Sequence, residues 1–534
     1  MNKVAAYLNE HLTGEVLTQG PAMLSAQQDN SVLSRRPEMI ARPVHINDVR
    51  KIMRFCSQLA EKGHNLSVTT RGYGTDITGA AMGSGIMIDM AAHLHRVMGL
   101  DPKQQLIHVQ AGASQRAAQA ALATHRGLVL PAGSFIDEDG TIGGALSRAA
   151  AGSMSAAYGT IGSAVQQLEV VLSNGDVLQT GRVSSRDLQK KRSLTTFEGE
   201  IYRQIDDLIT DNQEVIAELT QGSPETIGYH GITRVREQDG SFDLTPLFIG
   251  AQGTLGIVSE VILKAEFAHP ELSAVIAAYS TVDEAQNAVD LALKTKATTV
   301  ELLDGRLFER AAQAGKVVPW APPESYRGAV VIALFDTLSS RTRQKTAKKL
   351  QKSIELTRPL TVTLEEFDAA ELMSVHAVLA LATQPVEEHT VIPRVFSGLW
   401  LPLLRQDSFM AAIRALEVDY GVAMPLFVDV SSGLIDIFPA FSAKKISDRQ
   451  KILKLCADLV RLVREHEGTF VGQGGEGRLK ASFIYPTLPV EERQLYAQIK
   501  AIFDPRGILA PGVKQEVTLK EVAAELNAWC RLQD

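Results

Sequence analysis

The sequence predicts an α+β protein with more than one domain. Its strand-like and helix-like segments follow one another as strand–helix–strand units, yet several strands are also joined by short turns, as in antiparallel sheets. Asn174-Gly175 lies between two apolar runs of strand character, which is a strong local signal of a β-hairpin. The chain has 534 residues, and a single hydrophobic core rarely extends over that length.

The first part of the chain begins with a helical lead-in over residues 1–37 and then alternates strands with helices. A helix is predicted to start at Asn47-Asp48, which can cap it, because Val49, Ile52 and Met53 then share one apolar face. Strands are expected over 41–45, 66–70, 85–90, 106–111, 168–172 and 176–180, and helices over 47–59 and 114–124. The last two strands form the hairpin, with a type I′ turn.

The pattern changes after about residue 268, where strand–helix units are mixed with a further hairpin. Strands are expected over 274–279, 298–303, 329–335, 395–401, 426–430 and 434–438, and helices over 282–295, 341–354, 407–418 and 447–467. This mixture predicts a second α+β domain of ferredoxin-like arrangement.

The stretch from Pro131 to Thr160 contains six glycines and few large apolar side chains, so it is not ordinary core. Glycine lets the main chain approach a ligand closely, and consecutive N–H groups can form a nest for phosphate oxygens. A flexible surface loop is the alternative interpretation.

A second glycine-rich loop, Arg71 to Gly79, lies between two strand-like segments. Its arginine and its glycines suit a pyrophosphate, because they offer backbone donors and one fixed cation. The loop contains the spacing G-x-x-x-x-G but continues with Ala80 and Ala81, so it is not a nucleotide-triphosphate P-loop.

These two loops, together with residues 247–260 and 502–514, give the chain a specific resemblance. In this order the four blocks resemble the vanillyl-alcohol-oxidase/p-cresol-methylhydroxylase superfamily of FAD proteins. Within that superfamily the chain is similar to the FAD-linked oxidases that include glycolate and D-lactate dehydrogenases. The resemblance implies an FAD-binding domain of the p-cresol-methylhydroxylase type over 38–268, a substrate or cap domain over 269–460, and a C-terminal segment, 461–534, that returns to the FAD domain.

The resemblance also implies which residues hold the cofactor. The pyrophosphate is expected at Arg71, Gly72, Tyr73, Gly74, Thr75, Asp76, Pro131, Gly133 and Ser134. The isoalloxazine and ribityl side is expected at Thr141, Ile142, Gly143, Gly144, Gly152, Tyr158 and Gly159, and the adenine half at Gly253, Ile257 and Val258. Lys514 is a candidate partner for negative charge on the flavin, or else an exposed terminal lysine. The flavin is expected to be non-covalent, because Thr75 stands where members with a linked flavin carry a histidine.

The substrate side departs from the family pattern. Metal-using hydroxyacid members carry His-x-Gly-Asp-Gly-Asn-x-His, whereas Asp429 and Asp436 stand at the two histidine positions here. Gly474 stands at the histidine position of the family's Gly-Glu-His-Gly-Ile-Gly. His376 aligns with the arginine that the family pattern leads us to expect at a substrate carboxylate. Imidazole ligands for a divalent metal are therefore absent at every matched position, and no metal is expected.

The chain must then meet its substrate with other groups, because a hydroxy acid needs a cationic anchor and a base. The preferred catalytic candidates are Glu476, Arg478, His376 and Arg394, and the further candidates are Lys480, Asp429, Asp436 and His389. Glu476 and Arg478 are favoured because they lie where the family places catalytic groups. For each candidate the alternative is a surface charge or a satisfied polar group in the core. Asp429 and Asp436 could also bind a metal through oxygen.

The sequence from Gly472 to Gly477 matches the dinucleotide pattern G-x-G-x-x-G. It lies near the C-terminus, without the helix and ribose-binding acid of a βαβ unit, so an NAD site is rejected.

The function expected is an FAD-dependent oxidoreductase that takes a hydride from a small alcohol or hydroxy-acid-like substrate, with oxygen, a quinone or a carrier protein as electron acceptor. A flavin-binding protein without turnover, and an NADPH-dependent reductase of the cell-wall-precursor type, are the alternatives. A net charge of −7 argues against nucleic acid as a partner. No bilayer-spanning stretch, no signal-peptide core and three scattered cysteines favour a cytoplasmic protein. A homodimer is one of the assemblies expected.

Overall fold

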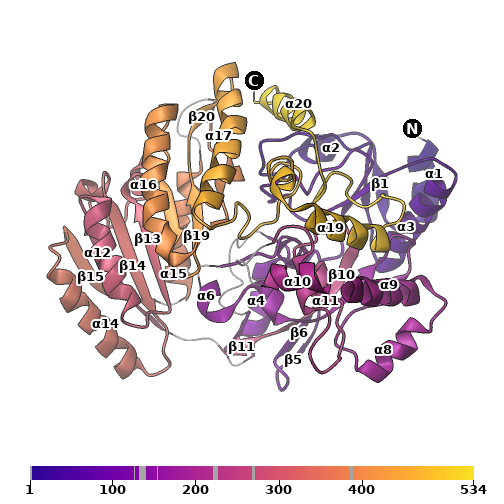
Figure 1. The fold of residues 1–534 in the computed structure, drawn as a ribbon, viewed down its shortest axis with the longest axis horizontal. Coiled ribbons are helices and arrows are strands. Elements are labelled where there is room, and N and C mark those ends of the chain that lie inside the picture. Colours follow the sequence, from indigo (N-terminus) through magenta and orange to yellow (C-terminus); the bar gives the residue numbers. More distant parts are fainter. Residues whose placement is uncertain are drawn as a thin grey trace. The chain divides into compact units, whose positions relative to one another are not determined.

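The computed structural model describes residues 3–125, 127–130, 140–152, 154–220, 226–267, 271–367, 369–384 and 389–533. Contacts divide the chain into two compact units (Figure 1). Unit 1 comprises residues 1–152, 159–266 and 471–532, and unit 2 comprises 153–158, 267–470 and 533–534. The expected domain boundaries remain predictions, although two of them, after 268 and after 460, lie near these divisions.

Among its described residues, unit 1 contains a four-stranded sheet and a five-stranded sheet. The first, in the order β1-β2-β4-β3, pairs β2, β4 and β3 in parallel, and the second, in the order β5-β6-β10-β8-β9, is antiparallel throughout. The strands of the first sheet are β1 Glu15–Leu17, β2 Met39–Arg42, β3 Val68–Arg71 and β4 Ile86–Asp89. Those of the second are β5 Val97–Asp101, β6 Leu106–Gln110, β8 Val165–Val171, β9 Val177–Gln179 and β10 Ile257–Lys264.

The predicted helix face packs as expected. In α3 (Ile46–Glu61), Val49, Ile52 and Met53 are buried in one core cluster with strands β2, β3 and β4. The same cluster contains Ile508 and Leu509, so the C-terminal segment closes the core of unit 1. The remaining helices of four or more residues are α1 Lys3–His11, α2 Pro21–Ser25, α4 Gln115–Ala123, α5 Ile142–Ser147, α7 Ile161–Ala164, α8 Ser185–Arg192, α9 Phe197–Asp211, α10 Gln213–Thr220, α11 Thr245–Phe248, α18 Ala481–Ile484, α19 Val490–Phe503 and α20 Leu519–Cys530.

The hairpin between β8 and β9 is confirmed, but its turn differs from the prediction. Gly175 has a positive φ of 82° and Asn174 does not, whereas a type I′ turn needs both. Leu172 and Asp176 are hydrogen-bonded, which leaves a three-residue loop with glycine at its left-handed position.

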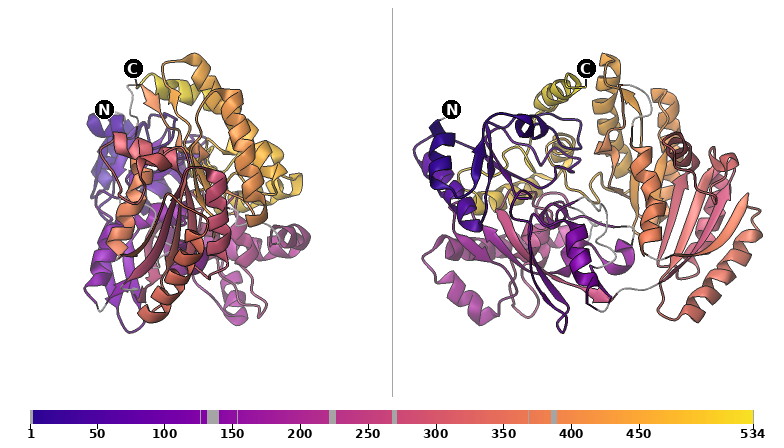
Figure 2. Two further views of the ribbon diagram at one scale, coloured as in Figure 1. Left: turned by 90° about the vertical axis from the view of Figure 1, so that its left-hand side faces the viewer. Right: turned by 180° about the vertical axis from the view of Figure 1, so that it is seen from behind.

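Among its described residues, unit 2 contains an antiparallel sheet of seven strands, in the order β15-β12-β14-β13-β18-β19-β17 (Figure 2). It also contains a two-stranded antiparallel sheet of β16 Thr390–Val391 and β20 Phe441–Ser442. The strands are β12 Leu272–Tyr279, β13 Thr299–Asp304, β14 Ala329–Phe335, β15 Thr361–Phe367, β17 Leu399–Trp400, β18 Leu426–Asp429 and β19 Leu434–Ile437. The helices are α6 Ser155–Tyr158, α12 Val282–Leu293, α13 Gly305–Gln313, α14 Ser340–Glu355, α15 Ala369–Ala382, α16 Leu403–Tyr420 and α17 Ile446–Glu465. Helix α12 packs on β12, β13 and β14, and α14 packs on β12 and β15.

The α+β class expected for both parts of the chain is therefore confirmed. One strand is shorter than expected. Over 395–401 only Leu399–Trp400 pair as β17, because a 3₁₀ turn occupies Arg394–Phe396 and Gly398 has a φ of 76°. Among the described residues, no helix is both long and apolar enough to cross a membrane.

Candidate functional site

A cleft in unit 1 collects several of the glycine-rich loops. It encloses about 930 Å³ of empty space, part of which is open to solvent. The loop after β3, the start of α5 and the segment before β10 form its walls. Of the residues expected to hold a cofactor, the lining includes Arg71, Gly72, Tyr73, Gly74, Thr75, Asp76, Thr141, Gly143, Gly144, Gly253 and Val258. Segments nearly 190 residues apart in sequence thus meet around one space.

Two of these loops are in such close contact that only glycine fits. A Cβ on Gly72 would lie 2.5 Å from Oγ1 of Thr141, the residue that caps α5 by accepting a hydrogen bond from the Gly144 N–H at 3.1 Å. A Cβ on Gly74, which has a φ of 75°, would lie 2.0 Å from the Arg71 guanidinium. The glycines therefore let the main chain and the arginine share the same wall of the cleft.

Arg71 carries the positive charge of this wall. Within the part of the chain that the structure describes, its guanidinium donates two long hydrogen bonds, at 3.4 Å to the Ala81 carbonyl and 3.5 Å to the Ser25 carbonyl. Burial lowers the pKa of Arg71, and the nearby carboxylates of Asp29 and Asp89 oppose that effect. A weakly engaged guanidinium beside glycine main chain fits the phosphate oxygens of a dinucleotide.

Asp76 holds the loop after β3 in shape. Its Oδ2 accepts hydrogen bonds from the Thr78 N–H and hydroxyl, both at 2.9 Å, and from the Ala80 N–H at 2.8 Å. This carboxylate therefore acts on the loop main chain rather than on a ligand.

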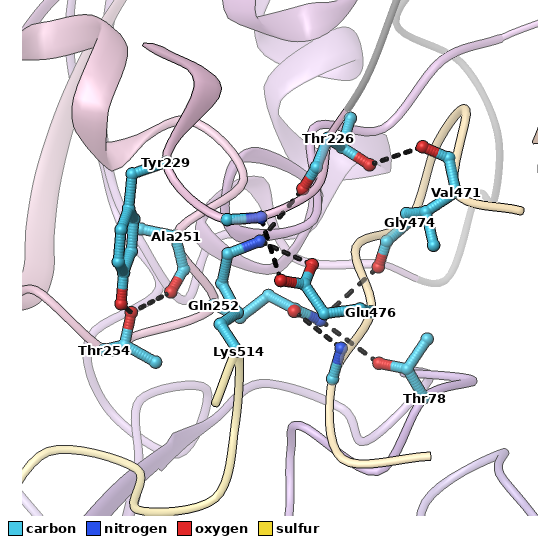
Figure 3. A network of polar contacts seen from close by, with 12 residues as sticks. Thr78, Thr226, Tyr229, Ala251, Gln252, Thr254, Val471, Gly474, Glu476 and Lys514 are labelled. Carbon is cyan, nitrogen blue, oxygen red and sulfur yellow. Dashed lines mark hydrogen bonds and ion pairs between the residues drawn. The ribbon is translucent and has the colours of Figure 1, made fainter. Parts of the chain in front are cut away.

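A buried polar network ties the loop after β3 to the C-terminal segment (Figure 3). The Gln252 side chain donates to Thr78 Oγ1 at 3.1 Å and accepts from the Gly477 N–H at 2.9 Å. The Gln252 amide thereby joins the three stretches of chain that make up unit 1, which are 1–152, 159–266 and 471–532.

Lys514 and Glu476 form an ion pair at the centre of this network. Both side chains are fully buried, and Nζ lies 2.7 Å from Oε2. Nζ also donates to the Thr226 carbonyl at 2.9 Å, while Oε1 of Glu476 accepts from the Gly228 N–H at 2.9 Å and the Tyr485 hydroxyl at 3.2 Å. Burial lowers the pKa of Lys514, and the carboxylate of Glu476 opposes that effect. Lys514 is not exposed, and its charge is matched inside the protein.

Arg478 is likewise buried, with 2% of its surface exposed. Its guanidinium donates to the main-chain carbonyls of Pro511 and, at 3.0 Å, Met82. Burial lowers its pKa to about 10. Neither Arg478 nor Glu476 lines the cleft, so their contacts link loops within unit 1.

A second group of candidate residues lies in unit 2. His376 of α15 donates from Nε2 to both carboxylate oxygens of Glu301, at 2.9 and 3.1 Å. Glu301 on β13 faces Asp429 on β18 across the sheet, and both are buried, at 0% and 2% exposure. Burial, followed by the charge of Glu301, raises the pKa of Asp429 to about 7. The structure thus brings together two predicted candidates, His376 and Asp429, through Glu301, which the sequence did not single out.

The other candidates in unit 2 are engaged separately. Arg394 donates to Ser397 Oγ at 3.3 Å and lies over the Phe438 ring, 6.0 Å from its centroid. Asp436 accepts from the Gly398 N–H at 2.7 Å. Within the described residues, no three His, Cys, Asp or Glu side chains converge on a position that could hold a metal ion.

The remaining predicted cofactor residues lie apart from the cleft lining. Ile142 is buried inside α5, and Gly152, Gly159 and Ile257 do not line the cleft. Tyr158 belongs to unit 2, where its hydroxyl donates to Asp336. Pro131, Gly133 and Ser134 lie outside the described residues. His389 and Lys480 are described but do not line the cleft either.

Sequence reasoning did not single out Gln252, Glu301 or Asp336. A signal existed for Glu301, since an acidic residue within the apolar run 300–303 must be buried or must interrupt the strand. Gln252 lies within the recognised block 247–260, but nothing in its local sequence indicates a bridging amide.

Two protein families match the chain. One, described as FAD binding domain, covers residues 37–181, and the other, FAD linked oxidases, C-terminal domain, covers residues 269–513. The chain is 26% identical to D-2-hydroxyglutarate dehydrogenase of Pantoea ananatis over 94% of its own length but only 50% of that protein. It therefore spans about half the length of this relative.

Other relatives match over most of both chains. The glycolate oxidase subunit GlcD of Bacillus subtilis is 23% identical, covering 89% of this chain and 88% of that protein. The solved structure of 4-ethylphenol oxidase from Gulosibacter chungangensis superimposes with a TM-score of 0.67 at 14% identity, covering 97% of each chain. At 14% identity this similarity shows a shared fold alone.

Proposed function

We propose that this chain, which belongs to the FAD-linked oxidases of the vanillyl-alcohol-oxidase/p-cresol-methylhydroxylase family, is a dehydrogenase or oxidase of small CH–OH substrates. Its FAD is held without a covalent bond, and its electrons pass to oxygen, a quinone or a carrier protein. Relatives named for D-2-hydroxyglutarate, glycolate and D-lactate support a hydroxy acid or a similar alcohol as the substrate class.

The cleft of unit 1 is the observation that carries this proposal. Its glycines let the loops and Arg71 pack into one wall where Cβ atoms would meet protein atoms, and Arg71 offers a cation whose hydrogen bonds to described residues are long. The main chain at Gly143 and Gly144 would contact the flavin half, and that at Gly253 and Val258 the adenine half. Thr75 lies in the lining and offers no imidazole for a covalent link, which supports non-covalent binding.

Bound FAD supplies the acceptor for a hydride taken from the carbon that bears the substrate hydroxyl. The chain's own residues bind the dinucleotide, exclude water and must supply a group that takes the hydroxyl proton.

The test is an anaerobic titration of the purified yellow protein. Acid precipitation should leave the flavin in the supernatant, and one member of a panel of alcohols, hydroxy acids and sugars should bleach the flavin absorbance. Arg71→Ala should weaken FAD binding at least tenfold, as loss of one charged hydrogen-bond donor predicts (about 1.5–3 kcal/mol). Arg54→Ala is the matched control, because Arg54 is half exposed and pairs with Asp176 at 3.8 Å.

The outcomes separate the alternatives. A colourless protein that takes up no FAD contradicts the proposal altogether. A protein that binds FAD but is bleached by no donor on the panel is a flavin-binding protein without turnover, and bleaching by NADPH alone identifies a reductase.

A further inference from the structure

Helix α14 of unit 2 carries a row of positive charges on its outer side. Its inner side packs on β12 and β15, at the edge of the seven-stranded sheet (Figure 1). The buried side chains of the inner side are Arg343, Ala347, Leu350 and Ile354. At 3.6 residues per turn, the side chains on the opposite side that fall within about 100° of the helix circumference include five exposed cations. These five, named here the α14 basic stripe, are Arg341, Lys345, Lys348, Lys349 and Lys352.

The stripe has no acidic partner in the part of the chain that the structure describes, because none of its five side chains forms an ion pair there. The carboxylates of Glu271 and Glu366 pair instead with Arg343 on the buried side of the helix, at 2.8 and 3.4 Å. Helix α17 of the same unit, by contrast, matches exposed cations with acids along its own surface. The pairs on α17 are Lys451–Asp448, Lys454–Asp458 and Arg461–Glu465.

The stripe works against the stability of the helix that carries it. Like charges stand four positions apart three times along α14, and this spacing is repulsive on a helix surface. The three pairs are Arg341–Lys345, Lys345–Lys349 and Lys348–Lys352. Arg341 also lies in the first turn, where the helix dipole disfavours a cation. A helix face that only meets water needs no such row of like charges, so the stripe indicates an anionic partner.

Exposed leucines accompany the stripe. Leu356, the C-cap of α14, continues the line of the stripe and is 83% exposed, and Leu338, next to the N-cap, is 76% exposed. Residues 338–360 contain seven Lys or Arg and a single acidic residue, although the whole chain has a net charge of −7. Clustered cations with apolar side chains at their margin are the composition of helices that lie on anionic bilayers.

We propose that the α14 basic stripe binds the surface of a bilayer that contains anionic lipids. The ammonium groups of the stripe contact lipid phosphates, and Leu356 and Leu338 reach the boundary between headgroups and acyl chains. Helix α14 stays packed on β12 and β15, so the chain lies on the bilayer and does not span it. This inference goes beyond the proposed function and does not depend on it, because it uses only contacts within unit 2.

The residue types of the stripe favour lipid over a macromolecular partner. Four of its five cations are lysine, a strongly hydrated point charge, whereas protein interfaces are depleted in lysine and enriched in arginine and aromatic residues. Helix α14 contains no aromatic side chain on which a nucleic-acid base could stack. Anionic headgroups offer many mobile phosphates, which match a row of point charges without requiring a fixed geometry.

The experiment is co-sedimentation of the FAD-loaded full chain with vesicles. One set contains phosphatidylcholine alone, and the other contains phosphatidylcholine with phosphatidylglycerol as the anionic lipid. The wild type should bind the anionic vesicles and not the neutral ones. Raising the salt concentration from about 0.05 M to about 0.5 M should release it, because the added ions screen the charges of the stripe and of the lipid.

The first variant removes three cations of the stripe. Lys345→Gln/Lys349→Gln/Lys352→Gln should weaken binding to anionic vesicles by about 10²-fold, because each cation near such a surface contributes about a factor of five. The matched control removes the same charge from α17, where the cations are paired with acids, and should leave binding nearly unchanged. This control is Lys451→Gln/Lys454→Gln/Arg461→Gln.

A second variant tests the apolar contact. Leu356→Ser should weaken binding to anionic vesicles severalfold without changing its dependence on salt, because it removes apolar area and no charge. Leu404→Ser is the control, since Leu404 is 93% exposed at the start of α16 in the same unit and should not affect binding.

Urea unfolding shows whether a loss of binding reflects misfolding. The three-lysine variant of α14 should unfold at no lower urea concentration than the wild type, because it removes like-charge repulsion and no ion pair to a described residue. Weaker vesicle binding by a variant of unchanged stability assigns the loss to the surface of α14.

Four results would overturn the inference. They are a wild type that does not bind anionic vesicles at low salt, equal binding to neutral vesicles, an equal loss of binding in the α14 and α17 triple variants, and a wild type that binds a labelled polyglutamate peptide or a single-stranded oligonucleotide but no vesicles. The last result identifies an acidic protein or a nucleic acid as the partner. None of the four affects the proposed function, which the flavin titration tests separately.

Discussion

Replacing Lys514 with methionine should be strongly destabilising, because it leaves the Glu476 carboxylate buried without a cation. Both side chains are fully buried and 2.7 Å apart. The Gly228 N–H and the Tyr485 hydroxyl would remain as donors, yet neither carries charge. Removing one partner of a buried pair costs about 3–5 kcal/mol, so Lys514→Met should lower the free energy of unfolding of unit 1 by that amount.

The double variant Lys514→Met/Glu476→Met should be less destabilised than either single variant. It removes both charges together but leaves the Gly228 N–H without its acceptor, which costs about 1–3 kcal/mol. Tyr485 keeps a partner, because its hydroxyl also donates to the Lys514 main-chain carbonyl at 2.6 Å. The coupling energy of this double-mutant cycle isolates the ion pair.

The assay is urea unfolding followed by the fluorescence of released flavin and by circular dichroism. Lys190→Met is the matched control, because Lys190 pairs with Asp187 on the surface of α8 and an exposed pair is worth about 0–1 kcal/mol. The reasoning is refuted if Lys514→Met is as stable as Lys190→Met, or if the double variant loses the sum of the two single effects.

Two further predictions concern the cleft and the buried acids Glu301 and Asp429. Gly74→Ala should weaken FAD binding, measured by flavin fluorescence quenching, far more than Gly63→Ala. Both glycines have a positive φ, but only a Cβ at position 74 would clash with Arg71. Equal losses of FAD affinity in the two variants would contradict this prediction. Asp429→Asn should flatten the pH dependence of stability. With a pKa of about 7 when folded and 3.8 when unfolded, the folded protein binds the extra proton between these values. Stability conferred by this proton is present at low pH and falls by up to roughly 4 kcal/mol as pH rises from 4 to 7. The prediction is refuted if the free energy of unfolding of Asp429→Asn, measured in urea, depends on pH as steeply as that of the wild type.

The cleft could be predicted because its signal is local. The need for glycine at positions 72, 74, 143 and 253 is expressed in the sequence itself, and these positions line one cavity in the structure. The helix face of Val49, Ile52 and Met53 was predictable for a similar reason, since period and burial agree. The sequence alone predicts a residue's role where that role depends on its neighbours along the chain.

The partners of the charged residues could not be predicted, because they are set by tertiary contacts. Lys514 follows a turn near the C-terminus and could equally have been exposed, but Glu476 lies 38 residues away and meets it in the core. Glu301 and Asp429 become neighbours only through the pairing of β13 with β18. Nothing local distinguishes an acid that pairs with a cation from an acid that faces solvent.

The expected departures from the family's metal motif concern residues whose side chains the structure shows engaged within unit 2. Asp429, which the resemblance leads us to expect at a histidine position of metal-using members, is the cross-strand partner of Glu301. Its raised pKa makes it a poor ligand, because ligands must lose their protons to bind metal. Asp436, which is expected at the second histidine position, accepts a hydrogen bond from the Gly398 N–H at 2.7 Å. His376, which is expected at the arginine position, donates from Nε2 to Glu301 at 2.9 Å. Asp429→His alone should therefore put a second imidazole opposite Glu301 without creating a metal site, because the Asp436 carboxylate is already engaged by the Gly398 N–H.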